Sequence, residues 1–128
     1  DFQKHDQQSI ENLYKKRLLD KSRVLTFADF VGKREADVED MFDEDFYLRL
    51  VGEEFGVSLT ASDIKSQHPR IVIRLEEYFT ANPLPKGSKY NHYRPARLLA
   101  EKPTSLTIPA TTLDRFERAF TALNALLR

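Results

Sequence analysis

The sequence contains no cysteine. This absence excludes disulfide bonds, cysteine nucleophiles and thiolate metal sites, and it fits a reducing compartment. Any bound metal ion would need carboxylate, carbonyl or imidazole ligands. The sequence also lacks an apolar run near the roughly 20 residues that a membrane-spanning helix needs. We therefore expect a cytoplasmic protein with no membrane partner.

Several catalytic motifs are missing as well. No GxxxxGK[ST] loop is present to hold ATP phosphates, and no GxSxG turn is present to expose a nucleophilic serine. The three histidines, His5, His68 and His92, stand far apart, and none has the HExxH spacing of a zinc site. We interpret each histidine as a cap or surface residue. A serine hydrolase is not expected.

Net charge is zero, because 20 Lys and Arg balance 20 Asp and Glu over 128 residues, a length that suits one domain. The two signs are nevertheless separated along the chain. Residues 35–54 hold nine acids and one base, and residues 82–100 hold four bases and no acid. These segments can steer a partner, or they can pair with each other within one domain.

Apolar residues spaced by three and four predict that most of the chain is helical. The clearest case is the C-terminal segment, where Leu113, Phe116, Phe120 and Leu123 predict a core helix. Arg23 to Phe27, RVLTF, is instead rich in β-branched and aromatic residues and predicts a short strand. The expected fold is mainly α with a small α/β N-terminal part (α+β), one strand at about 23–27 and four to five helices. The expected helices cover 9–19, 46–55, a segment around 71–79, 94–101 and 111–128.

Seven carboxylates fall within residues 35–45, just ahead of an apolar segment. Asp43 is placed to cap the helix that follows, and acids in a first helical turn are favoured by the helix dipole. Asp37, Glu39 and Asp40 have no such explanation. Since carboxylates are preferred Mg²⁺ ligands, these three are candidate metal ligands. The alternative is that they lie in solvent.

The order of a helix, then RVLTFADF, then the acidic EADVEDMF segment ahead of another helix resembles the last part of a Toprim domain in ATP-dependent nucleases of the OLD family. The resemblance covers residues 1–56, and residues 57–128 would be a helical C-terminal extension packed on them as one compact unit. It implies a parent with an N-terminal AAA or ABC-type ATPase and a Toprim domain that cleaves nucleic acid with Mg²⁺. The chain begins at Asp1 without Met, which fits a fragment of such a parent.

The resemblance also has departures. The early Glu-bearing loop and the DxD pair of Toprim domains are absent, so the fragment alone is expected to be inactive, with ATP bound in a domain that this chain lacks. Its partners would be the remaining ATPase and Toprim parts, DNA and a second copy in a homo-oligomer. Within this interpretation Asp37, Glu39 and Asp40 contribute to a metal site of the full-length protein.

A basic and aromatic segment, KGSKYNHYRPAR at residues 86–97, begins within the Pro- and Gly-containing loop at residues 82–89. Lysine and arginine contact phosphates, and tyrosine rings stack on bases. The candidate nucleic-acid-binding residues are Lys86, Lys89, Tyr90, Tyr93, Arg94 and Arg97. The alternative is structural: the tyrosines pack on the edge of the core, and Arg94 and Arg97 pair with the acidic end of the domain.

A second class of function remains open beside the nuclease. The chain can be a non-catalytic helical protein-interaction module, in which the acids cap helices and apolar helix faces pair with another chain. The two hypotheses differ in what they require of the acids. A nuclease needs carboxylates free to bind metal, whereas the module needs them only to hold helices in place.

Overall fold

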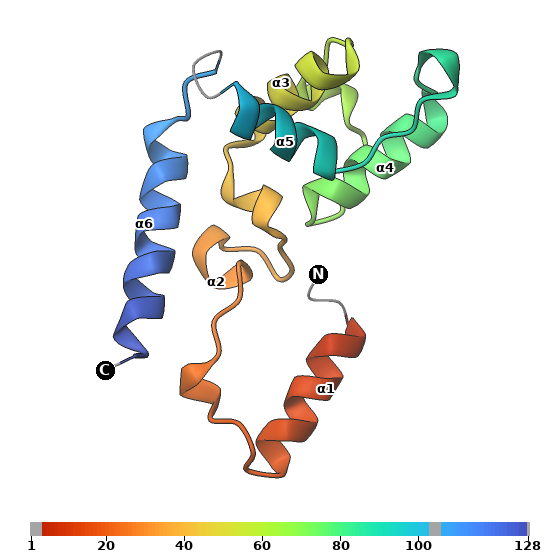
Figure 1. The fold of residues 1–128 in the computed structure, drawn as a ribbon. Helices are drawn as coiled ribbons and strands as arrows, with labels where there is room; N and C mark the ends of the chain where they lie inside the picture. The colour runs from red at the N-terminus through yellow and green to blue at the C-terminus, as the bar shows by residue number, and fades with distance from the viewer. Residues whose placement is uncertain (1–3, 103–105, 128) are drawn as a thin grey trace.

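The computed structural model describes residues 4–102 and 106–127. Six α-helices follow one another in the described chain (Figure 1): α1 Lys4–Lys15, α2 Ala28–Val31, α3 Glu44–Phe55, α4 Ile71–Ala81, α5 Tyr93–Glu101 and α6 Ala110–Ala125. Four short 3-10 helices lie between them: η1 Lys21–Arg23, η2 Val38–Met41, η3 Ala61–Asp63 and η4 Pro85–Gly87. Within the described ranges, no helix is long and apolar enough to cross a membrane.

The predicted strand at 23–27 is wrong, and with it the small α/β part, because residues 4–102 and 106–127 contain no strand. Local hydrogen bonds favour turns here. Asp20 caps η1 through the backbone N–H of Ser22, at 2.9 Å. Both the N–H and the hydroxyl of Thr26 donate to Asp29 Oδ2, at 2.7 and 3.0 Å, which turns the chain into α2. The described fold is all-helical, because β propensity alone forms no sheet without a partner strand.

The core lies around α3, which packs mainly against α5 and is joined by α4. Half of its twelve residues are buried, on more than one side of the helix. Phe46, Leu48 and Val51 are almost inaccessible to solvent. The remaining buried apolar residues of the cluster are Tyr47, Leu50, Leu59, Ile64, Ile71, Val72, Leu75, Phe79, Leu84 and Leu98.

A tight reversal after α3 brings the chain back onto the helix. Gly56 ends α3 with φ 68, the left-handed conformation that glycine adopts at least cost, and this confirms the helix end predicted from sequence. The returning backbone then passes over Gly52, where a Cβ atom would lie 2.5 Å from the carbonyl oxygen of Val57. Gly52 is therefore required by the close approach of Val57.

Helix α6 buries little of its apolar face against the rest of the described chain. Phe116 meets the ring of Phe42 edge-on, with centroids 5.4 Å apart, and Thr112 is its one buried residue among those described. Phe120 is 61% exposed and Leu123 is 51% exposed. The helix was predicted correctly, but its predicted place in the core was wrong, because the apolar face is largely uncovered.

Helix α1 stands apart from the other helices (Figure 1). None of its described side chains, residues 5–15, is buried. Its connection to α2 runs through residues 16–27 and η1. The division of the chain at residue 56 into two parts stays a prediction.

Candidate functional site

Asp40 joins its own turn at η2 to Lys33 and to the start of α4, which lies 31 positions further along the chain. Its Oδ2 accepts the backbone N–H of Asp37 at 2.9 Å, which fixes the turn at η2. Its Oδ1 accepts the backbone N–H of Ile71 at 3.1 Å, at the start of α4, and the ammonium of Lys33 at 2.7 Å. The carboxylate of Asp40 is therefore occupied by structural hydrogen bonds.

Asp37 pairs with Arg70, the residue that precedes α4. Its Oδ2 lies 2.7 Å from Arg70 Nε, and both side chains are buried. Asp37 Oδ1 is also buried and accepts no hydrogen bond from the residues that the structure describes. The hydrogen bond from Arg70 to Asp37 also raises the pKa of Arg70, as expected for a pair that favours both charges.

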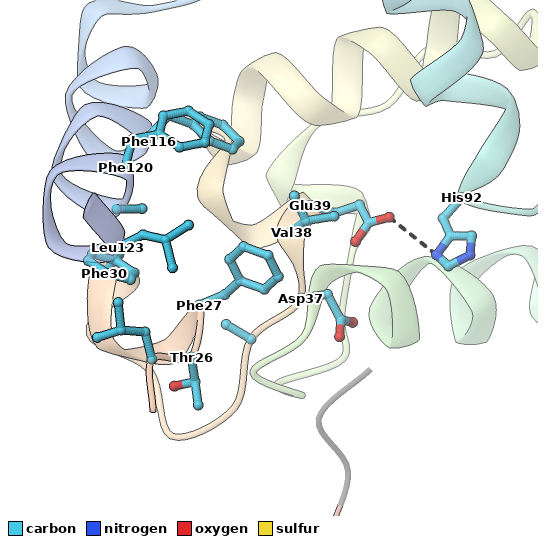
Figure 2. Close-up of a pocket in the computed structure, with 13 residues that line it drawn as sticks. Thr26, Phe27, Phe30, Asp37, Val38, Glu39, His92, Phe116, Phe120 and Leu123 are labelled. Carbon is cyan, nitrogen blue, oxygen red and sulfur yellow. Dashed lines mark ion pairs between the residues drawn. The ribbon is translucent and has the colours of Figure 1, made fainter. Parts of the chain in front are cut away.

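Glu39 lies closer to solvent and faces a different partner. Its Oε1 lies 3.2 Å from His92 Nδ1. The dashed line in Figure 2 marks this pair. Burial raises the pKa of Glu39, and the nearby Asp37 and Asp40 charges also raise it, against the lowering effects of a hydrogen bond from its own backbone and of His92. Asp37 and Asp40 each pair with an Arg or Lys side chain, whereas Glu39 pairs with a histidine among the described residues.

These three acids do not fit a Mg²⁺ site as they are arranged. Asp37 and Asp40 are each neutralised by a cation at 2.7 Å, whereas Glu39 turns toward His92. Among residues 4–102 and 106–127, no group of three His, Asp or Glu side chains is positioned to hold a metal ion. Magnesium binding in a full-length protein stays a prediction, and these contacts give it no support.

The neighbouring acids also connect helices. Asp43 takes the predicted position ahead of α3, but its side chain makes no capping bond to that helix. Instead it accepts hydrogen bonds from Thr111 and from Arg115, the latter at 2.7 Å, so it joins α3 to α6. Glu44 pairs with Arg74 of α4 through two hydrogen bonds of 3.0 and 2.8 Å.

The predicted nucleic-acid-binding residues divide into two groups. Tyr90 packs between Phe79 and Phe55, with centroids 5.3 and 5.7 Å away, and Arg94 pairs with Glu54 at 2.7 Å. These two residues stabilise the core, as the structural alternative predicted.

The other four candidates are exposed: Lys86, Lys89, Tyr93 and Arg97. Arg97 lies 3.7 Å from Glu101 of the same helix, rather than meeting the acidic residues 35–54. Lys86 and Lys89 lie in and after η4, whereas Tyr93 and Arg97 belong to α5. Nucleic-acid binding by this segment stays a prediction, now resting on four side chains instead of six.

A pocket of about 630 Å³ opens between α2, η2 and α6 (Figure 2). We call it the α2–α6 pocket. Its walls are mainly apolar, and Asp37, Glu39 and His92 provide its polar side chains together with the hydroxyl of Thr26. The remaining lining residues are Leu25, Phe27, Phe30, Ala36, Val38, Phe116, Ala119, Phe120 and Leu123.

Two hydrogen bonds join α6 to the elements that form the other walls of the pocket. Arg118 Nη2 donates to the backbone oxygen of Phe30 at 3.2 Å, which ties α6 to α2. Arg115 Nη1 donates to the backbone oxygen of Met41 at 2.9 Å, which ties α6 to η2. Between these contacts, aromatic rings from both helices remain accessible, and accessible aromatic rings are typical anchors of protein interfaces.

Sequence analysis selected Asp37 and Glu39 as candidate metal ligands. It did not predict the pocket that they line. The walls come from segments at 25–30, 36–39 and 116–123. The available signal was the apolar periodicity of α6, which indicates an apolar face but not whether that face is covered.

Comparison with protein-family models, with curated proteins and with solved structures gives no match for this chain.

Proposed function

We propose that this chain is a non-catalytic helical interaction module, and that the α2–α6 pocket binds an apolar helix face of a protein. The observation that carries the proposal is the exposure of Phe120 and Leu123 beside Phe27, in the wall of one pocket. Large apolar groups gathered in this way on a surface mark interaction sites. A helix that lays i, i+3, i+4 and i+7 side chains into an apolar groove is a common mode of recognition.

Charge favours a helix that also carries basic residues. The charged side chains that line the pocket, among the described residues, are the carboxylates of Asp37 and Glu39, with His92 beside them. Asp37 already has Arg70 as its partner, so Glu39 is the group that an incoming Lys or Arg would stabilise. Such a contact adds specificity to the apolar contacts.

Peptide display on the intact chain tests this proposal. We expect selected peptides to show apolar residues at helical spacing together with Lys or Arg, and we expect Phe120→Asp to abolish their recovery. Thr121→Asp adds the same charge to an exposed position on another side of α6 and serves as the matched control. Equal recovery on wild type and Phe120→Asp, or selected peptides without helical spacing, would refute the proposal.

The nuclease hypothesis rests on the resemblance to the OLD family. It requires an upstream Glu-bearing loop and a DxD pair in the parent sequence, and it predicts Mg²⁺-dependent cleavage that is lost on changing Glu39 to Ala. Glu39 is the informative position, because Asp37 and Asp40 hold the fold together. An interaction module predicts that this variant alters partner binding only.

We propose a cytoplasmic location for the protein under either function, since a chain without cysteine suits a reducing compartment.

A further inference from the structure

We propose that the helix that occupies the α2–α6 pocket is α1 of a second copy of this chain, so that two copies associate by exchanging α1. This inference rests on the proposed function and specifies its partner. It follows from three features: an apolar face on α1 that the described part of its own chain leaves largely uncovered, a connection that holds α1 away from its own pocket, and complementary charge.

The first feature is the unpartnered face of α1. Ile10, Leu13 and Tyr14 lie at spacings of three and four, on one side of the helix. Leu13 is exposed, and Ile10 and Tyr14 are only half-buried. An isolated helix of this length is marginal in water, and an amphipathic helix is stabilised chiefly by packing its apolar face. Helix α1 therefore has an apolar face suited to the kind of pocket that α2 and α6 form.

The second feature is the connection between α1 and α2. Arg17 takes a left-handed conformation, φ 55, and Leu18 donates its N–H to the oxygen of Leu13 at 3.0 Å, which ends α1 in a reversal. Lys21 then lies over the ring of Tyr14, 5.9 Å from its centroid. With the caps of η1 and α2, this connection is a succession of ordered turns, and it places α1 away from α6 of the same chain (Figure 1).

The third feature is charge. Residues 4–17 contain four bases and two acids, and three of the bases are consecutive at positions 15–17. Of these, Lys15 and Lys16 follow Leu13 within one helical turn, about 3–5 Å along the axis. A helix that inserts Ile10 and Leu13 between α2 and α6 can therefore bring Lys15 or Lys16 to Glu39 at the polar side of the pocket.

Exchange between two copies satisfies both pockets at once. Each copy gives one α1 and receives one, so the interface is two-fold and closed, and neither α1 nor the pocket is left to recruit further copies. Specific interfaces bury roughly 1,200–2,000 Å² in total, and the exchange provides two helix-in-pocket contacts toward that area instead of one.

Sedimentation of the intact chain and of two variants tests the exchange. Leu13→Asp alters the inserted helix, and Phe120→Asp alters the pocket. Both residues are exposed within one copy, so both variants are expected to fold, with unchanged circular dichroism. We expect a dimer for the wild type and an increase of at least about tenfold in the dimer dissociation constant for each variant.

Mixing the two variants gives the sharper result. The Leu13→Asp copy keeps an intact pocket and the Phe120→Asp copy keeps an intact α1, so only the mixture retains one correct contact. We expect heterodimers in the mixture and weaker association in either variant alone. Asn12→Asp, which adds the same charge to the opposite side of α1 and keeps the acceptor of Gln8, should leave the dimer intact.

Other outcomes overturn the inference. A wild-type chain that stays monomeric, or a mixture that associates no better than its components, excludes exchange of α1. If peptides selected by display still bind the pocket in that case, the proposed function stands and only its partner is wrong. If nothing binds the pocket, both proposals fail.

Discussion

Asp37 and Arg70 form an ion pair that is shielded from water on both sides, with side chains 3% and 8% exposed. Burying two charges costs desolvation free energy, which a good geometry offsets only while both partners are present. Asp40 lies three residues away and is equally enclosed, yet it satisfies Lys33 and the start of α4. These acids determine how η2 is joined to α4.

Replacing Asp37 by Ala should lower the free energy of unfolding by about 3–5 kcal/mol, because the Arg70 charge would remain buried without this partner. Urea denaturation measures the change. Asp45→Ala is the control, since Asp45 is exposed in the first turn of α3 and its removal should cost at most about 1 kcal/mol. Equal losses in the two variants would contradict a structural role for Asp37.

Replacing Gly52 by Ala should also destabilise the chain, by about 1–3 kcal/mol, since the new methyl group would be forced against the Val57 carbonyl. The sign of the change in unfolding free energy is informative, because Gly→Ala inside an unhindered helix stabilises by about 1 kcal/mol. Thermal unfolding followed by circular dichroism gives the comparison. Glu53→Ala, at the exposed next position, should leave the melting temperature almost unchanged.

At the scale of elements, α6 shows the limit of sequence reasoning. The 3.6-residue period gave the helix correctly, since periodicity depends only on local spacing. Burial of its face depends on which segments fold over it, and Phe120 and Leu123 have no such cover in the described chain. The segment at 23–27 failed for a related reason, because strand formation needs a partner whereas Asp20 and Asp29 stabilise turns by themselves.

For the acidic residues too, the sequence predicts local position but not distant partners. Asp43 was predicted to lie ahead of α3, and it does, but its partners Thr111 and Arg115 are about seventy positions away and no local pattern indicates them. Gly56 was predicted as a helix end, and the prediction is confirmed because the left-handed conformation is a local requirement.

The link between α3 and α6 should weaken in acid. The hydrogen bond from Thr111, with help from Arg115, lowers the pKa of Asp43 below the usual aspartate value. A depressed pKa contributes stability that is present above the unfolded pKa and is lost as the pH falls through the folded pKa. We therefore expect Asp43→Asn to reduce stability at pH 7 and to behave like wild type at the lowest pH. Denaturation at a series of pH values checks this, and a constant difference between the two proteins would contradict it.

At the scale of the whole molecule, the helices that hold the core differ from the helices whose apolar faces are accessible. The buried side chains gather around α3, α4 and α5, whereas α1 and α6 carry apolar residues on their accessible faces. Local unfolding starts where few apolar contacts hold an element. The N-terminal helix should therefore separate from the remainder without disturbing it.

Removing residues 1–17 should leave the unfolding free energy of the remainder within about 0.5 kcal/mol of the full chain. The comparison requires a concentration at which the full chain is monomeric, because association adds apparent stability. Chemical denaturation of the two proteins side by side is the measurement. A loss of several kcal/mol would show that α1 packs on its own chain.

The single buried residue of α6, Thr112, has a consequence for how this sequence can change over evolutionary time. Substitutions at Phe120 or Leu123 remove no packed core, so they escape the selection that keeps a fold stable. Under the proposed function, binding alone limits drift on this face. Related chains can then retain the α3 core while diverging in what they recognise.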